Sequence, residues 1–404
     1  MKNTSSSRLT GFDAARGIAM LLVCISHFFD VFNKQSQLTA FFKYEEWAQF
    51  VLLICKMATP TFFLVSGLVL GFLYRTKGRR FGLLRLHLLD KALFLLTIGH
   101  VLIAIFWAVR SGFSPSIKMG FVTDTLAFCM IGSLLLLPRT AATTRLWLGI
   151  ALYLASWIGW CFWSPDNPIL HTLKSIFLGS QEDGIVIFYF PLLPWFGLHL
   201  MSGYLGEYLS QYRSGDLYWQ AAIRLSRLAA TLVLAGLAIM MVYKALRTLD
   251  LVRPTINLYR FVTPWQKQPP GPLYLLLLGG GALLVISALL FAERVHGIRR
   301  YLRLAETVGR NSLFAFLLQF FVYYTVFHLL VTTNGLISPW MAMGFLPVSL
   351  LGQLAVITWL DRYHIHRAWT IGLPALVRSW PRAALPLYAS SATHPSPHRH
   401  DIAA

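Results

Sequence analysis

The chain alternates between long apolar segments and short polar connections. Each apolar run is long enough, at 1.5 Å per helical residue, to cross about 30 Å of hydrocarbon. Because a backbone in lipid must satisfy its own polar groups, these runs are expected to be helices. The pattern predicts about ten spans, at residues 12–32, 46–73, 86–109, 119–137, 144–163, 185–207, 228–246, 272–292, 311–331 and 339–360.

The connections carry their own signals. Residues 75–85, RTKGRRFGLLR, are the most basic short loop, and residues 164–184 are expected to form an external loop with one short helix. The long polar connection 247–271 ends in the proline-dense TPWQKQPPGP, and the arginine-rich stretch 293–312 predicts an interfacial helix. Pro60 predicts a kink in the second span, and the prolines of YFPLLPWFG predict an interrupted sixth span.

Composition supports a membrane protein. Apolar residues make up 56% of the 404 positions and charged residues only 13%, which is too apolar for an ordinary soluble chain. The net charge of +19 comes from basic residues in the loops, a pattern that sets membrane orientation and does not indicate a nucleic-acid partner. We therefore predict an all-α, polytopic helix bundle in a lipid bilayer, with both termini cytoplasmic.

Neither a disulfide framework nor a metal site is predicted. The four cysteines, Cys24, Cys55, Cys129 and Cys161, lie inside apolar segments and form no CxxC pair. Residues 379–404 have the composition of a disordered cytoplasmic tail, and their three histidines are better explained by a solvated tail than by a metal tract. Residues 1–378 are then a single transmembrane domain.

The first span carries an unusual set of charged and polar residues. Its sequence is DAARGIAMLLVCISHFFD, in which Arg16 and His27 fall on one helical face, roughly 16 Å apart along the axis. Asp13 and Asp30 fall in the same stripe. A charge near a bilayer centre costs on the order of 3 kcal/mol, so the stripe should face protein or a water-filled cavity. The alternative is a terminal anchor, with Asp13 and Arg16 at the inner headgroups and His27 at the far interface.

Several polar residues are expected to converge on the outer half of the bundle. A histidine near its ordinary pKa can accept a proton from a hydroxyl or amine, and a carboxylate beside it can orient its ring, so this set suits acid–base chemistry. The alternative is that each residue is a buried polar group satisfied by a neighbouring helix. We favour this alternative for Lys56, His100 and Asp124 taken singly. The residues are His27, Asp30, Lys56, His100 and Asp124.

The first helix, RLTGFDAARGIAMLLVCISHFF, resembles that of the transmembrane acyltransferases, which include the acyltransferase-3 proteins and the heparan-alpha-glucosaminide N-acetyltransferases. Arg16 and His27, with ten residues between them, match the acyltransferase-3 pattern. Four later stretches are similar to the bacterial heparan-acetyltransferase-like branch. They are ATPTFFLVSGLVLG (58–71), FPLLPWFGLHLMSGYLG (190–206), PPGPLYLLLLGGGALL (269–284) and VGRNSLFAFLLQ (308–319).

This resemblance implies a multi-pass enzyme of the bacterial inner (plasma) membrane. Such an enzyme moves an acyl group, typically acetyl from cytoplasmic acetyl-CoA, to a sugar hydroxyl or amine of an envelope or exported glycan, and it can form a homo-oligomer. The catalytic candidates carried over by position are His27, which would activate the acceptor or relay the acyl group, and Arg16, a structural or donor-facing cation. Asp30 joins them as a ring-orienting carboxylate, although at i+3 it can point elsewhere. Gln319 stands where many relatives carry histidine.

Further candidates are assigned to binding. The substrate-binding set is Asp13, Lys56, His100, Asp124, Trp195, Asn311 and Gln319. Acyl-CoA carries phosphates, which arginine binds well, so a donor-phosphate set is drawn from the basic cytoplasmic face. Its members are Arg79, Arg80, Arg299, Arg300 and Arg310, although the positive-inside rule alone would also place arginines there.

The competing hypothesis is a transporter or flippase for a lipid-linked or anionic metabolite. Intramembrane polar residues and broken helices also mark transport paths. An inverted repeat is not evident, because the proline–glycine pattern of the sixth span has no counterpart in the other half of the chain. The acyltransferase is therefore the preferred hypothesis.

Overall fold

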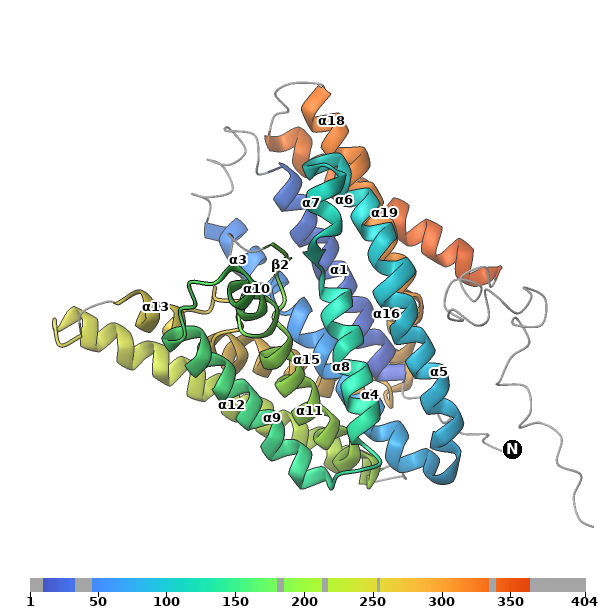
Figure 1. Cartoon of the computed structure of the whole chain (residues 1–404). Coiled ribbons are helices and arrows are strands. Elements are labelled where there is room, and N and C mark those ends of the chain that lie inside the picture. The colour runs from blue at the N-terminus through green and yellow to red at the C-terminus, as the bar shows by residue number, and fades with distance from the viewer. Residues whose placement is uncertain are drawn as a thin grey trace, which may run out of the picture.

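The computed structural model describes residues 10–32, 46–179, 185–212, 217–252, 255–333 and 339–363, and these residues form a helix bundle (Figure 1). Apart from helices, this part of the chain holds a two-stranded parallel sheet of β1 (Met119–Gly120) and β2 (Ile187–Phe188). Eight helices within it are long and apolar enough to cross a membrane, and Val122–Leu136 is a shorter apolar helix. The prediction of an all-α polytopic membrane bundle is confirmed.

The long spans are single helices or helices joined by short turns. They are α1 (Thr10–Phe32), α3 with α4 (Glu46–Cys55, Ala58–Lys77), α5 with α6 (Phe81–Phe94, His100–Ser111), α9 (Ala142–Phe162), α12 (Leu217–Thr248), α14 with α15 (Pro272–Tyr274, Gly280–Ala292), α17 with α18 (Ser312–Phe320, His328–Thr333) and α19 (Pro339–Arg362). π-helical turns join three of these pairs, at Leu95–Gly99, Leu275–Gly279 and Phe321–Phe327.

The remaining helices are shorter or lie between the spans. They are α7 (Phe113–Ile117), α8 (Val122–Leu136), α10 (Pro168–Phe177), α11 (Leu192–Ser210), α13 (Ile256–Val262) and α16 (His296–Arg310). Of these, α10 is the short helix expected within residues 164–184, and α16 occupies the arginine-rich stretch. The basic loop is shorter than predicted, because α4 continues to Lys77 and α5 begins at Phe81. The predicted tail, residues 379–404, lies outside the described residues.

The sixth predicted span, 185–207, differs from its expected form. Its first residues are extended and include β2, and α11 then runs unbroken from Leu192. Pro191 precedes the helix and Pro194 lies in its first turn, where a backbone N–H has no intrahelical acceptor to lose. The prediction of an interrupted helix is therefore wrong here, and α11 is a continuous helix packed against α4 and α9.

Pro60 breaks the helix of the second span, and the break lies one helical turn before the proline. It lacks the N–H that would bond to the carbonyl of Lys56, and its ring would clash with that carbonyl. The helix is interrupted at residues 56–57, between α3 and α4. The freed Lys56 carbonyl accepts a hydrogen bond from the Tyr274 hydroxyl at 2.9 Å. The break thus ties α14 to the second span and leaves Lys56 at a partly buried turn of the backbone.

Two contacts fix α1 within the bundle. The backbone N–H groups of Thr10 and Gly11, unpaired at a helix start, donate to the Glu293 carboxylate at 3.3 and 3.0 Å. Gly17 and Gly309 then bring α1 and α16 into backbone contact. A Cβ on Gly17 would lie 1.9 Å from the Ala305 carbonyl oxygen, and one on Gly309 would lie 1.7 Å from that of Asp13. Only glycine permits this approach.

The apolar core has two main parts, and α1 contributes to both. One surrounds Phe28, Phe32 and Tyr323, between α1, α6 and the α17 region. The other surrounds Trp195 and Tyr274, between α4, α11, α12 and α15. Figure 1 shows α1 crossing the middle of the molecule, with α9, α11 and α12 to one side and α16 and α19 to the other. The polar stripe of α1 is therefore enclosed by protein on several sides.

The orientation predicted from the loop charges can be tested with exposed positions. Cysteine at Asp166, before α10, should react with an impermeant thiol reagent added to intact cells. Cysteine at Lys77, at the end of α4, should react only after permeabilisation. Both side chains are exposed, so protein burial would not mask either site. Labelling Lys77→Cys in intact cells, in a background without other cysteines, would reverse the orientation.

Candidate active site

His27 is held by a helix from the other end of the chain. Its Nδ1 lies 2.6 Å from Oε1 of Gln319, on α17. A side-chain carbonyl only accepts, so Nδ1 carries the proton and donates it. The other ring nitrogen, Nε2, makes no hydrogen bond within the described residues, and it keeps a free lone pair. Gln319 thus selects the tautomer in which His27 can act as a base.

Aromatic rings surround this imidazole. Phe320 meets it edge-on at 5.4 Å between ring centres, and Tyr324 lies at 5.1 Å. Trp107 of α6 packs in turn on Tyr324 at 4.4 Å. Tyr324 belongs to the π-helical turn Phe321–Phe327, and such turns widen a helix and frequently occur at functional sites. The histidine therefore sits half-buried in an aromatic enclosure with one polar partner.

Asp30 has different partners. Its carboxylate oxygen Oδ2 accepts from Arg110 Nη1 at 2.5 Å and from the Tyr324 hydroxyl at 3.1 Å. Arg110 also lies over the Trp107 ring, 4.8 Å from its centre. Asp30 thus has the separate partners that the i+3 spacing allowed, and its hydrogen bonds go to Arg110 and Tyr324 instead of to His27. Tyr324 instead joins the two groups, since it contacts the imidazole and the carboxylate.

His100 and Asp124 form a second polar pair. His100 Nδ1 lies 2.9 Å from Asp124 Oδ2, which also accepts from the backbone N–H of Phe121 at 2.7 Å. The remaining ring nitrogen, Nε2, lies 3.3 Å from the Ile117 carbonyl. Rings of Phe121 and Phe320 separate this pair from His27. These contacts place the pair at the cap of α8, the structural role favoured from the sequence, while Asp124 Oδ1 is buried without a hydrogen-bond partner within the described residues.

A connection from the other half of the chain brings two lysines together. Lys56 donates to the Trp265 carbonyl at 3.2 Å and lies 4.8 Å from the centre of the Trp265 ring. Lys267, two residues on, lies over Phe190 at 4.9 Å. Its charge acts on His27, and the charge of Lys56 acts on Lys267. Burial, with a further contribution from the Lys56 charge, lowers the pKa of Lys267 to about 8. Lys267 was not among the sequence candidates.

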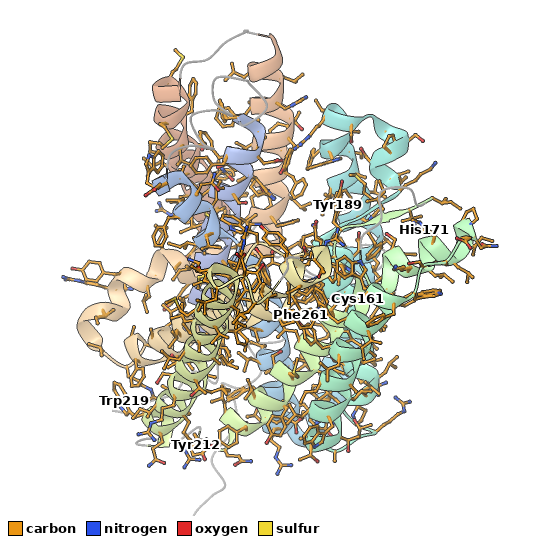
Figure 2. The ribbon with its side chains drawn as sticks, turned by 90° about the vertical axis from the view of Figure 1, so that its left-hand side faces the viewer. Cys161, His171, Tyr189, Tyr212, Trp219 and Phe261 are labelled. Carbon is orange, nitrogen blue, oxygen red and sulfur yellow. The ribbon has the colours of Figure 1, made fainter. Side chains whose placement is uncertain are left out.

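The segment that carries Lys267 is fixed to α9. The Pro270 carbonyl accepts from the Tyr153 hydroxyl and from the Trp157 indole, both at 3.0 Å. Phe261 packs edge-on against Trp157 at 4.9 Å, and Arg260 lies over Trp160. In Figure 2, Phe261 lies near Cys161 at this end of α9, well away from Tyr212 and Trp219. The segment that carries Lys267 is thus packed into the helix bundle through these contacts with α9.

Three other candidates lie away from His27. Trp195 is fully buried and stacks on Phe63 at 4.5 Å between ring centres, so it belongs to the core. Asn311 is buried, and its amide donates to Thr307 and Asp361, which ties the start of α17 to α19. Asp13 pairs with Arg16 at 3.7 Å beside the Gly309 contact, near the first turns of α1. The structure does not support Trp195 or Asn311 as substrate contacts beside His27.

The donor-phosphate arginines have mixed surroundings. Arg80 and Arg300 are exposed, and Arg300 donates to the Tyr301 hydroxyl at 2.5 Å. Arg310 is bound to Asp361 at 3.1 Å, so it is already neutralised. The side chains of Arg79 and Arg299 lie outside the described part of the chain. A common phosphate-binding cluster is therefore not formed by the described members of this set.

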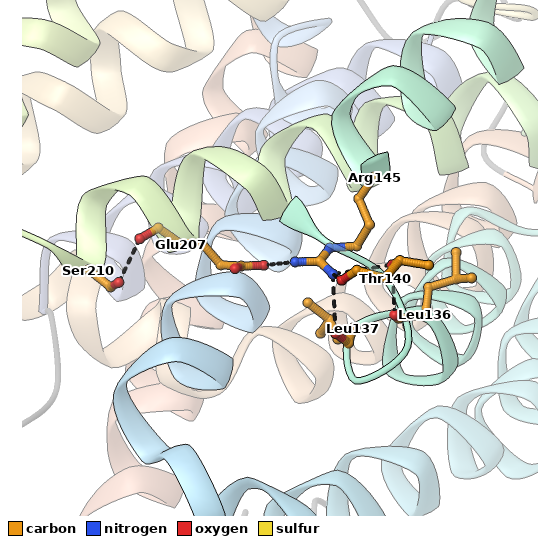
Figure 3. A network of polar contacts seen from close by, with 6 residues as sticks. All are labelled: Leu136, Leu137, Thr140, Arg145, Glu207 and Ser210. Carbon is orange, nitrogen blue, oxygen red and sulfur yellow. Dashed lines mark hydrogen bonds and ion pairs between the residues drawn. The ribbon is translucent and has the colours of Figure 1, made fainter. Parts of the chain in front are cut away.

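A buried ion pair that the sequence did not indicate lies near the end of α11. Arg145 of α9 donates to Glu207, to the Leu137 carbonyl at 3.1 Å and to Thr140 (Figure 3). A pocket of about 300 Å³ opens beside it, lined mainly by polar residues that include Arg75, Tyr204 and Gln211. Arg75, Thr140 and Gln211 flank three loops that the charge pattern places in the cytoplasm. These loops meet at one end of the bundle.

The geometry suits proton transfer within a multi-pass membrane protein. One imidazole has a fixed tautomer and a free Nε2, a cation–carboxylate pair lies one helical turn away, and the charge of Lys267 acts on the imidazole from another segment. The acyltransferase domain model, Acyl_transf_3, matches residues 9–360, so nearly all the described residues fall within it. The chain is thus a membrane-bound acyltransferase by class, and it belongs to the acyltransferase-3 family.

The match confirms the superfamily expected from the first helix. The finer assignment to a heparan-acetyltransferase-like branch stays a prediction. No curated protein matches the sequence significantly. The acyl group and the acceptor must therefore be inferred from the chemistry of the site.

Proposed function

We propose that this protein transfers an acetyl group from cytoplasmic acetyl-CoA to a hydroxyl or amine of a sugar in an envelope or exported glycan. The observation that carries the proposal is the hydrogen bond from His27 Nδ1 to Gln319, which leaves Nε2 available as a base. The family match supplies the reaction class. The position of His27, five residues before the end of α1, favours an acceptor that arrives from the side opposite the basic loops.

The transfer step follows from this geometry. The acceptor hydroxyl or amine gives its proton to His27 Nε2 as its oxygen or nitrogen attacks the thioester carbonyl. The C–S bond then breaks, and the leaving thiolate takes the proton from the imidazolium. Gln319 Nε2 is buried and has no hydrogen-bond partner within the described residues. A thioester is already activated, and oriented approach with proton removal is what the protein must add.

Replacing His27 should separate catalysis from folding. His27→Ala should reduce acetyl transfer by about 10²–10⁴-fold, the range expected for loss of a general base. Transfer is measured as release of CoA thiol with a sugar acceptor, and folding by size-exclusion profile and melting temperature in detergent. Asp30→Asn should lose less activity, because its carboxylate binds Arg110 and Tyr324 and does not bind the imidazole. A well-folded His27→Ala protein with full turnover would remove His27 from the mechanism.

Gln319 should act as a positioning residue, with a pH signature. Gln319→Leu removes the acceptor for Nδ1–H and should slow transfer roughly tenfold, the cost of about one hydrogen bond. Gln319→Glu keeps an acceptor and adds a negative charge, which stabilises the imidazolium. Since the base must be neutral, the rising limb of the pH–rate profile should move to higher pH in Gln319→Glu. An unmoved limb would mean that Gln319 only fills space.

The donor is expected to bind at the basic cytoplasmic face. The double variant Arg80→Gln, Arg300→Gln should weaken binding of acetyl-CoA, because both guanidinium groups are exposed and arginine binds phosphate well. Insertion into the membrane should be retained, since the other loop arginines remain. The matched control is Arg247→Gln, at the end of α12 on the opposite face. Unchanged acetyl-CoA binding in the double variant would exclude a role for these arginines in donor binding and leave them only the role of setting membrane orientation.

A further inference from the structure

Lys56 and Lys267 share an unusual electrostatic setting. Lys56 and Lys267 are close enough for their charges to interact, and Lys267 also acts on His27. Neither lysine forms an ion pair with a carboxylate in the part of the chain that the structure describes. Asp30, an acid near this site, is occupied by Arg110 and Tyr324. The site therefore holds an excess of positive charge beside the imidazole.

Packing keeps both ammonium groups in place. Lys56 lies at the helix break caused by Pro60, with its nitrogen on the Trp265 carbonyl and ring. Lys267 lies over Phe190, in a segment that Tyr153 and Trp157 hold through the Pro270 carbonyl. Phe190 is itself tied to α8, because its carbonyl accepts from Thr125 at 2.5 Å. Both lysines thus belong to fixed segments, and the charge of Lys267 reaches His27.

This arrangement is costly without an anion. Two half-buried ammonium groups repel each other and lose part of their hydration, and an aromatic face or one carbonyl compensates only partly. An anion between them would form charge-assisted hydrogen bonds and remove the repulsion. Protein segments built to hold two like charges together are typical of sites that bind the opposite charge.

We infer that the acceptor carries an anionic group, a carboxylate or a phosphate, which Lys56 and Lys267 bind so that a nearby hydroxyl or amine meets His27 Nε2. This inference rests on the proposed function and adds a substrate class to it. The carboxylate would come from an acidic sugar such as a hexuronate, and the phosphate from a phosphorylated or lipid-linked sugar. Neutral sugars would lack this anchor.

The site should also respond to pH. The charged and titratable groups around Lys267 are Lys56 and His27, with Asp30 and Arg110 acting on His27 as well. Lys267 is cationic below its pKa and binds an anion only in that form. The Michaelis constant for an anionic acceptor should therefore rise as the pH increases through about 8, where Lys267 loses its proton. A bound anion should shift that transition upward, because it favours the charged amine.

The test compares three matched acceptors, a methyl hexoside, the corresponding hexuronide and the hexoside phosphate, in detergent-solubilised full-length protein. KM and kcat for transfer from acetyl-CoA are measured for wild type, Lys56→Gln, Lys267→Gln and Lys267→Arg. We expect the wild type to prefer the hexuronide or the phosphate, and the preferred one identifies the anion. Lys267→Gln should raise KM for that acceptor roughly tenfold to a hundredfold and leave kcat nearly unchanged. Lys267→Arg should retain most of the preference.

A matched control and a binding measurement complete the design. Lys118→Gln removes an exposed lysine near β1 and should change neither constant. Binding of each acceptor is followed by quenching of tryptophan fluorescence, since Trp265 contacts Lys56. Transfer without any preference for the anionic acceptors would overturn the inference and leave the transferase intact. Lysine-dependent binding of the anions without any transfer would support the anion site and count against the transferase. The absence of both binding and preference would overturn the inference.

Discussion

A polar group inside a bilayer must find its partner within the protein, and the stripe on α1 imposes this requirement on the whole bundle. His27 is satisfied by Gln319, and Asp30 is satisfied by Arg110 and Tyr324. Two of these three partners lie almost 300 positions away in the sequence. Helices from both ends of the chain must therefore meet around α1. The same contacts that make the helix tolerable in lipid also set the tautomer of its histidine.

The spans were predictable because each segment must by itself be long and apolar enough to cross the hydrocarbon layer of the bilayer. Hydropathy alone placed nearly every long helix, and the steric effect of Pro60 located a break in the second. The sixth span was described less well, since a proline in the first turn of a helix and one in its middle look alike in sequence. Their effects differ because only a proline in the middle of a helix removes an intrahelical hydrogen bond.

The site was partly predictable for a related reason. A histidine and an aspartate inside an apolar run are conspicuous, so His27, Asp30, His100 and Asp124 could all be selected. Their hydrogen-bonding partners could not be selected, because the hydrophobic period of one helix does not show which other helices pack beside it. Arg110 and Lys267 stood at a helix end and in a polar connection, where basic residues are ordinary. Trp195 was selected from a family-like stretch, but its ring proves to be a packing element of the core.

The contact between Gly17 and Gly309 has a mechanical consequence. With no side chain between them, α1 and α16 meet as two backbones, and neither helix can slide or tilt alone. The amphipathic sequence of α16 suits the bilayer surface, whereas α1 continues ten residues past Gly17 to His27, about 15 Å farther along the axis. A displacement of α16 is therefore passed to α1 through backbone atoms, because no side chain lies between the two helices at this point to absorb it.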